Sequence, residues 1–265
     1  MIRIEGDLYE KFSRSIYINK GSSDLSKLNK WKQPFYFFGD SDLLVQDMAG
    51  PCGALATIQA QILFYRSQQE YSNVNVNREH LLILSLLDIM QRIGQHYVFC
   101  TSFNPKAKIA EFIQKDTQEE AIQYIKESNF LSNPQSVLLY LLSIVFLANK
   151  MTKMQTIGVP LLGADQFTEM TLVWIMLLGT LNEDMISQME SGNESMLPQH
   201  EISLRVIHNS TQVNGTHFNR NANIFVVHNI DHFIAVSKFP NFAIVYDTLN
   251  YKKGPHPVSL NSIFD

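Results

Sequence analysis

The chain has 265 residues, of which 45% are hydrophobic and 17% are charged, and its formal net charge at pH 7 is -4. This is the composition of a globular protein, and so small a charge without a cluster of Lys and Arg argues against a nucleic-acid partner. The longest apolar run, Val137 to Ala148, is shorter than the roughly 20 residues that a membrane-spanning helix needs, so we expect no membrane segment. Met1 to Asp7 lacks a basic segment followed by an apolar core, so we also expect no signal peptide.

Cysteine usage favours a reducing compartment. The two cysteines, Cys52 and Cys100, could form one disulfide, but two residues cannot build the disulfide framework of a small secreted domain. We therefore expect a cytosolic or nuclear protein.

The first 40 residues combine a polar stretch with an aromatic run. Residues 1–30 are mixed and polar, and Ser23 with Asp24 is expected to cap a short helix. Phe35 to Phe38 has strand propensity after Pro34. Large aromatic side chains are usually buried, so we expect this run to form a core strand or a wall beside the loop that contains Cys52.

Apolar residues at steps of three and four predict helices through the middle of the chain. The predicted helices cover Gly53 to Arg66, Arg78 to Ile93, a segment that Thr117 caps and that ends near Glu127, a segment that starts at Ser132 and carries Val137 to Phe146, and Gln166 to Leu181. The second of these is apolar on nearly all sides, which predicts that it is buried. His96 to Cys100 reads as a short buried strand in which Cys100 is a packing residue.

The last third of the chain changes from helical to strand periodicity. Three β-rich runs, Asn223 to Val227, His232 to Val236 and Phe242 to Tyr246, predict an antiparallel meander. The preceding polar stretch, residues 183–217, is loop-like apart from a strand candidate at Ile202 to Ile207. Helices followed by a sheet indicate an α+β fold. We predict a single domain over residues 1–265, with a helical part at about 40–182, a polar loop at about 183–217 and a sheet at about 220–250.

Cys52 stands where a loop meets a predicted helix. Gly50 and Pro51 break the chain directly before it, and the apolar helix follows from Gly53. At a helix N-terminus a thiol faces unpaired backbone N–H groups and the positive end of the helix dipole, and both favour the thiolate that attacks carbonyl carbons. Gln46 lies six residues upstream, close enough for its amide to donate to a developing oxyanion. The segment indicates acyl transfer, and the alternative is that Cys52 is a small buried hydrophobe.

A general base has to come from one of eight histidines. His232 begins the second predicted strand and Asp247 ends the third, so antiparallel pairing would bring them together. A carboxylate could then orient one imidazole nitrogen while the other faces a thiol, which is the logic of a Cys–His–Asp triad. Two alternatives stay open: a structural histidine, or a metal site made by His228 and His232. No third metal ligand has recognisable spacing, so we expect no metal and no other cofactor.

Two patches of the sequence resemble the MINDY family of deubiquitinases. One runs from Trp31 through the aromatic residues and then from Gln46 to Gln59, with a Gly-Pro-Cys-Gly-Ala-Leu-Ala core. The other is Phe225 to Val227 followed by Asp231 to Phe233, and the stretch from Leu161 to Leu178 is similar to a family helix. The resemblance covers roughly residues 28–250, and the spacing of the glutamine and the cysteine is its specific part.

The resemblance implies a variant of the papain-like cysteine protease fold and assigns roles to the candidate residues. Cys52 would be the nucleophile, His232 the general base and Gln46 the oxyanion donor, and Asp247 is the candidate for the third member by position rather than by motif. The implied partners are ubiquitin and polyubiquitin, and the reaction is hydrolysis of the isopeptide bond between a ubiquitin C-terminus and a lysine. The implied preference is for chains of the proteasome-targeting lysine linkage. Ala49 replaces the first glycine of the family motif, which restricts the backbone of this loop.

Two other functions remain compatible with these residues. A papain-like peptidase or acyltransferase that acts on another tail would share the nucleophile but not ubiquitin. A non-catalytic relative would bind ubiquitin without turnover, and its Cys52 would have ordinary thiol reactivity.

Overall fold

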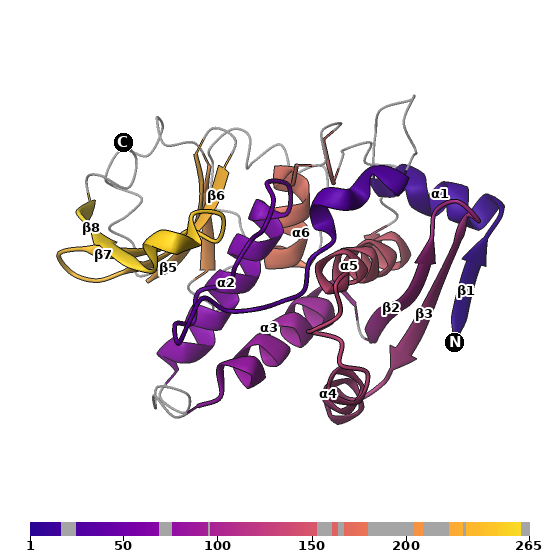
Figure 1. Ribbon diagram of the computed structural model, residues 1–265, viewed down its shortest axis with the longest axis horizontal. Coiled ribbons are helices and arrows are strands. Elements are labelled where there is room, and N and C mark those ends of the chain that lie inside the picture. Colours follow the sequence, from indigo (N-terminus) through magenta and orange to yellow (C-terminus); the bar gives the residue numbers. More distant parts are fainter. Residues whose placement is uncertain are drawn as a thin grey trace. The chain divides into compact units, whose positions relative to one another are not determined.

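The computed structural model describes residues 1–16, 25–68, 76–94, 96–152, 161–163, 167–179, 204–208, 223–229 and 232–260 (Figure 1). They form an α+β protein, as expected. Backbone contacts divide the chain into two compact units, Met1–Phe35 with Leu87–Gln199 and Tyr36–Leu86 with His200–Asp265, called unit 1 and unit 2 below. The single domain expected over residues 1–265 stays a prediction. Among the described helices, none combines the length and the apolar character that crossing a membrane requires.

Unit 1 packs helices against a three-stranded sheet. Its elements are β1 (Ile2–Glu5), α1 (Asp7–Ile16), η1 (Leu25–Trp31), β2 (Tyr97–Asn104), β3 (Ile109–Lys115), α4 (Gln118–Glu127), α5 (Ser136–Thr152) and α6 (Met170–Leu178). The antiparallel sheet has the order β1-β3-β2, and α5 packs against β2 (Figure 1). The helix α3 (Arg78–Ile93) contributes residues to both units.

This first sheet corrects the expectation that helices come first and the sheet comes last. The sequence predicts one strand here, from His96 to Cys100, whereas β2 extends to Asn104 and pairs with β3, which pairs in turn with β1. The missed strands alternate apolar and charged residues over only a few positions, so they read as polar chain rather than as core. Arg3 on β1, for example, faces solvent and pairs with Glu111 on β3. Helix α1 is also absent from the prediction, because its buried apolar residues, Tyr9, Phe12 and Ile16, stand among polar ones over only ten positions.

Local hydrogen bonds and backbone conformation set where the predicted helices begin and end. Thr117 caps α4 as expected, because its hydroxyl accepts from the backbone N–H of Glu120 at 3.2 Å. α5 begins at Ser136 rather than at Ser132, because Asn133 forms a turn in which its side chain accepts from the N–H of Gln135 at 2.8 Å. α6 is shorter than the predicted Gln166 to Leu181 and ends at Gly179, which has a φ of 80°.

Two further expectations for this half of the chain are tested by burial. Cys100 is fully buried in β2, which confirms it as a packing residue, and both cysteines are free thiols. Phe35 is buried, but Tyr36 and Phe38 are each 36% exposed, and the aromatic run makes only an isolated bridge between Phe37 and Leu44. The run is therefore not a core strand. The expected cap at Ser23 and Asp24 lies outside the described residues.

Unit 2 carries a five-stranded sheet. Its elements are α2 (Cys52–Ser67), β4 (Leu204–His208), β5 (Ile224–Asn229), β6 (His232–Lys238), β7 (Ala243–Tyr246), η4 (Tyr251–Lys253) and β8 (His256–Val258). The strands follow the order β4-β5-β6-β7-β8, and β4 is parallel to β5 while all other pairs are antiparallel. The predicted meander is confirmed, as is the strand candidate at Ile202 to Ile207, shifted by one or two residues. Apart from β4, the predicted polar loop at 183–217 lies outside the described residues.

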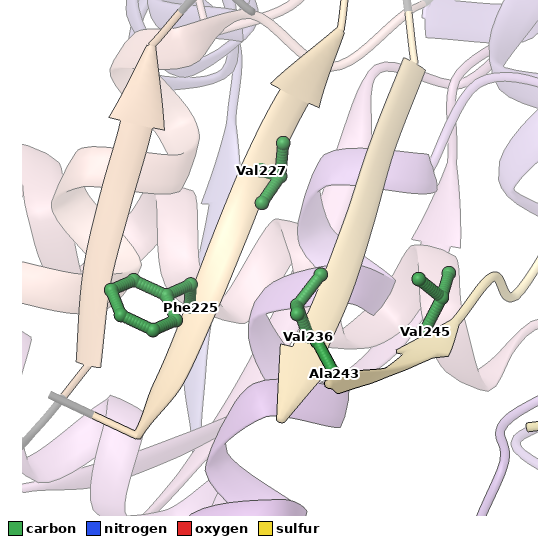
Figure 2. Packing of buried hydrophobic residues seen from close by; sticks show 5 residues of the cluster. All are labelled: Phe225, Val227, Val236, Ala243 and Val245. Carbon is green, nitrogen blue, oxygen red and sulfur yellow. The ribbon is translucent and has the colours of Figure 1, made fainter. Parts of the chain in front are cut away.

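The β5–β6–β7 meander has an apolar cluster on one face. Phe225 is opposite Val236, which is opposite Val245, so their side chains point to the same side (Figure 2). Val227 and Ala243 complete the cluster, and all five side chains are buried. Helix α2 packs against β5 and β6 and is buried from Cys52 through Leu63. Close packing on the sheet and along α2 gives a firm support to the residues at the ends of these elements.

Candidate active site

Cys52 is the first residue of α2, and only 2% of it is exposed. The residue two positions before it, Gly50, has a φ of 144°, a conformation that residues with a side chain rarely adopt. This turn delivers the sulfur to the helix N-terminus, where Pro51 occupies the capping position without a side-chain hydrogen bond. The first N–H groups of a helix have no acceptor within the helix and concentrate positive charge there. The local structure thus gives Cys52 the setting that the sequence predicts.

His232 and Asp247 lie side by side at one end of the β6–β7 pair. The imidazole Nε2 donates to Oδ1 of Asp247 at 2.9 Å. The thiol of Cys52 lies close enough to the imidazole to raise its pKa. Asp247 accepts further hydrogen bonds from the backbone N–H of Leu249 at 3.1 Å and from the side chain of Asn250 at 2.7 Å. Carboxylate, imidazole and thiol therefore lie together, all within unit 2.

The surroundings of His232 favour its charged form. Burial is the largest effect and lowers its pKa, but the hydrogen bonds and the negative charges of Asp247 and Cys52 together outweigh burial and raise the pKa of His232 to about 9. The imidazole is therefore protonated at neutral pH. An imidazolium beside a cysteine stabilises the thiolate and can later give its proton to a leaving amine.

Asp247 is held in the ionised form that this arrangement requires. Burial, the largest effect, raises its pKa, but the hydrogen bonds from His232 and Asn250 outweigh burial and lower the pKa of Asp247 to about 2. A permanently charged carboxylate fixes the imidazole in one orientation and compensates its positive charge.

Gln46 is buried, and its side chain is held in one orientation. Its Oε1 accepts from the hydroxyl of Thr248 at 3.0 Å, and its Nε2 donates to the carbonyl of Met48 at 2.8 Å. Because the carbonyl of Met48 can only accept, Nε2 must face it, and Met48 lies in the loop that leads to Cys52. Nε2 carries two N–H groups, and one of them is used by Met48, so the other could donate to an oxyanion.

Thr248 is the site residue that sequence reasoning missed. It is fully buried, donates its hydroxyl to Gln46 and also accepts the backbone N–H of Gln46 at 2.8 Å through its carbonyl. Its neighbour Asp247 holds His232, so two adjacent residues position both the imidazole and the carboxamide. The only signal in the sequence is this adjacency, which carries no information until the position of Gln46 is known.

Helix α2 also positions the segment before Gln46. The side chain of Gln59 accepts from the N–H of Leu44 at 2.8 Å and donates to the carbonyl of Asp42 at 3.0 Å. Arg66, seven residues further along α2, donates from its guanidinium group to both carboxylate oxygens of Asp42, each at 2.8 Å. Two-point contacts of this kind fix direction as well as distance. The helix that presents the thiol therefore also holds the strand-like segment that presents the carboxamide.

Aromatic side chains flank this segment. The backbone of Tyr36 accepts from the N–H of Val45 at 3.0 Å, and the Tyr36 hydroxyl donates to the carboxylate of Asp47. The rings of Phe38 and Tyr251 lie 5.6 Å apart between centroids. The aromatic run is thus a partly exposed wall beside the loop that contains Cys52, one of the two roles expected for it.

Two other histidines in the described part of the chain have partners outside this site. The ring of His228 stacks on Phe233 with centroids 4.2 Å apart, and His96 pairs with Asp116 at 3.3 Å. In the described parts of the chain, no three His, Cys, Asp or Glu side chains are grouped so that they could hold a metal ion. The alternative of a metal site at His228 and His232 gains no support from these residues.

Comparison with known proteins finds a distant relative. No family model matches the chain, and no solved structure matches it. The chain is similar to the "Probable ubiquitin carboxyl-terminal hydrolase MINDY-4" of Bos taurus, with 26% identity over 220 residues. The match covers 70% of this chain but 29% of the relative, so the chain spans less than a third of the length of that protein. This distant similarity supports a relationship to MINDY proteins.

Proposed function

We propose that the chain is a cysteine-dependent deubiquitinase that hydrolyses ubiquitin isopeptide bonds. The observation that carries the proposal is the grouping of three side chains: the imidazole of His232 donates to Asp247, and the thiol of Cys52, at the N-terminus of α2, lies close enough to raise the pKa of that imidazole. Gln46 adds an oriented amide donor in the loop before the thiol. The similarity to a protein named as a ubiquitin carboxyl-terminal hydrolase supports ubiquitin as the substrate class. A papain-like arrangement of the catalytic residues is part of this proposal.

In the first step the thiolate of Cys52 attacks the carbonyl carbon of the last glycine of ubiquitin. The carbonyl oxygen becomes an oxyanion, which accepts hydrogen bonds from the backbone N–H of Cys52 and from Nε2 of Gln46. The imidazolium of His232 then gives its proton to the lysine nitrogen, the C–N bond breaks and the amine leaves. A thioester between Cys52 and ubiquitin remains.

In the second step water hydrolyses the thioester. His232, now neutral, removes a proton from water while the oxygen attacks the thioester carbonyl. The C–S bond breaks, ubiquitin leaves as a carboxylic acid that loses its proton to the solvent, and the thiolate and imidazolium pair forms again. Asp247 stays ionised throughout and keeps the imidazole oriented.

Linkage preference and compartment belong to the same proposal. Resemblance to the MINDY family motif supports chains of the proteasome-targeting lysine linkage as substrates. A panel of diubiquitins, each with one linkage, tests this part separately. A catalytic thiolate has to stay reduced, which supports a cytosolic or nuclear location.

The experiment is incubation with ubiquitin that carries a C-terminal propargylamide, followed by intact-mass analysis. We expect one covalent adduct on the wild type, none on Cys52→Ala, and an adduct on Cys100→Ala, which removes the other, buried thiol. An adduct that persists on Cys52→Ala would contradict the proposal. Reaction only with probes that carry other tails would identify the peptidase or acyltransferase alternative, and ubiquitin binding without any adduct would identify the non-catalytic one.

A further inference from the structure

Asn250 donates two hydrogen bonds to the carboxylate of Asp247. Its backbone N–H donates to Oδ1 at 3.0 Å, and its side-chain Nδ2 donates to Oδ2 at 2.7 Å. Oδ1 also accepts from the backbone N–H of Leu249 and from Nε2 of His232. In the described part of the chain, the bond from the side chain of Asn250 is the one that Oδ2 accepts. This side chain therefore sets how the second oxygen of the carboxylate is held.

The side chain of Asn250 does not serve the local structure in which the residue stands. Asn250 occupies the capping position before η4, where an asparagine side chain usually accepts a hydrogen bond from a backbone N–H of the following turn. Here the side chain forms no capping bond. Because a carboxylate can only accept, the amide nitrogen is the atom that faces Asp247. The amide is thus directed at the candidate site instead of at its own turn.

Donors on both oxygens fix the plane of the carboxylate. A carboxylate held through Oδ1 alone can turn about that oxygen, whereas a second donor on Oδ2 fixes its direction as well as its position. The direction matters because Asp247 orients the imidazole only while Oδ1 stays in contact with Nε2 of His232, which lies 2.9 Å away. Asn250 is therefore placed to keep the imidazole in register with the carboxylate.

The same hydrogen bonds keep the proton on the imidazole. Burial raises the pKa of Asp247, but the hydrogen bonds from His232 and from both N–H groups of Asn250 outweigh burial and lower this pKa to about 2. A carboxylate stabilised in this way does not take the proton that it shares with Nε2. The charged imidazole is thus preserved beside the thiol of Cys52.

We propose that Asn250 is a positioning residue of the candidate site, whose side-chain amide keeps Oδ1 of Asp247 against Nε2 of His232. This inference rests on the proposed function. Asn250 acts through the carboxylate rather than on the reacting bond, so its removal should slow the chemical step and leave substrate binding unchanged.

The experiment measures kcat and KM separately for a fluorogenic ubiquitin amide. For Asn250→Ala we expect kcat to fall about tenfold with an unchanged KM. Asn250→Asp keeps the size of the side chain but places a second negative carboxylate beside Asp247 at about pH 8, so kcat should fall further than in Asn250→Ala. A residue that only filled space in this turn would tolerate aspartate better than alanine. Asn241→Ala changes an exposed asparagine between β6 and β7 and should keep the wild-type kcat.

A double-mutant cycle shows whether Asn250 acts through Asp247. In an Asp247→Ala background, Asn250→Ala should change kcat by no more than about twofold. Equal losses in both backgrounds would overturn the inference, because Asn250 would then act independently of the carboxylate. A wild-type kcat in Asn250→Ala would overturn it as well. So would a rise in KM alone, since it would assign Asn250 to substrate binding.

Alkylation separates this inference from the enzymatic proposal. If the wild type forms no adduct with ubiquitin propargylamide, the proposed function fails, and the rate of iodoacetamide alkylation decides the inference without ubiquitin. The Cys100→Ala protein retains Cys52 as its one thiol. In this protein, Asn250→Ala should lower the alkylation rate about threefold or more, and the same change should have no effect once Asp247 is alanine. Equal rates with and without Asn250 would overturn the inference.

Discussion

The sheets of the two units place their polar residues differently. In the β1-β3-β2 sheet, charged side chains lie on the exposed positions and pair across strands, as Arg3 does with Glu111 at 3.4 Å. In unit 2, the polar groups of the candidate site lie at the start of β6 and in the loops that follow β7 or precede α2, and they are partly or fully buried, as Gln46, His232 and Thr248 are. Exposed ion pairs contribute little to the free energy of folding, whereas buried polar groups need hydrogen-bond partners within the protein. The candidate chemistry therefore belongs to the ends of the second sheet, and substitutions in the two sheets should have different consequences.

Replacing the imidazole should have the largest effect. His232→Ala removes both the partner that stabilises the thiolate and the proton donor, so kcat/KM for a fluorogenic ubiquitin amide should fall by about 10⁴-fold. Circular dichroism should show a folded protein. Substituting the exposed His96 of unit 1 by alanine serves as the control and should leave turnover unchanged. Activity of His232→Ala within tenfold of the wild type would remove this residue from the mechanism.

Removing the amide donor should have the second-largest effect. Gln46→Ala takes away one hydrogen bond to the oxyanion, which corresponds to a loss of about 10²- to 10³-fold in kcat. Thr248→Val keeps the shape of the neighbour but not its hydroxyl, so the amide loses the contact that orients it and kcat should fall about tenfold. If Gln46→Ala raised only KM, the amide would bind the tail rather than the transition state.

A change at the end of α6 should affect stability and leave the chemistry intact. A Cβ built at Gly179 would lie 2.1 Å from the carbonyl oxygen of Arg92, and the φ of 80° also disfavours a side chain. Gly179→Ala should therefore lower the free energy of unfolding by about 2 kcal/mol or more in a denaturant titration. Arg3→Ala, which breaks an exposed pair in the same unit, should change it by less than about 0.5 kcal/mol. Equal effects of the two substitutions would contradict this packing account.

The free energy of unfolding should depend on pH, because the imidazole of His232 is more readily protonated in the folded protein than in the unfolded chain. The pKa of His232 rises from 6.5 to about 9 on folding, so its contribution is fully present below pH 6.5 and is lost as the pH rises through about 9. The difference in unfolding free energy between the wild type and His232→Gln should shrink by on the order of 2 kcal/mol over this range.

Labelling kinetics test the same ion pair at the sulfur. At pH 6.5, iodoacetamide should label Cys52 faster in the wild type than in His232→Ala, because the charged imidazole stabilises the attacking thiolate. Equal labelling rates in the two proteins would remove the ion pair from the mechanism.

The predictable part of the molecule is the part with a strong local pattern. The apolar period of α2 and α3, the cap at Thr117 and the three β-rich runs of the meander are visible in the sequence, and the structure has them within a few residues. The proximity of His232 and Asp247 also follows from local reasoning, because it requires only that two neighbouring strands pair.

The missed part depends on contacts between distant positions. β1 and β3 are short, half-exposed strands that gain their identity from pairing with each other across more than 100 residues of chain. Thr248 contacts a glutamine 202 residues away, so neither its burial nor its role can be read from its neighbours. The division of the chain into two units cannot be read from the sequence either, because each unit is assembled from two separate stretches of sequence.

The pair of adjacent residues Asp247 and Thr248 has a consequence for how this site can evolve. Because one peptide unit carries the supports of both the imidazole and the carboxamide, the two groups share a common reference point. An inserted or deleted residue here would displace both at once, so intermediate levels of function are difficult to reach by changes in this turn. Lineages that abandon the chemistry should show it first at these two positions, and lineages that keep the chemistry should keep the spacing between them.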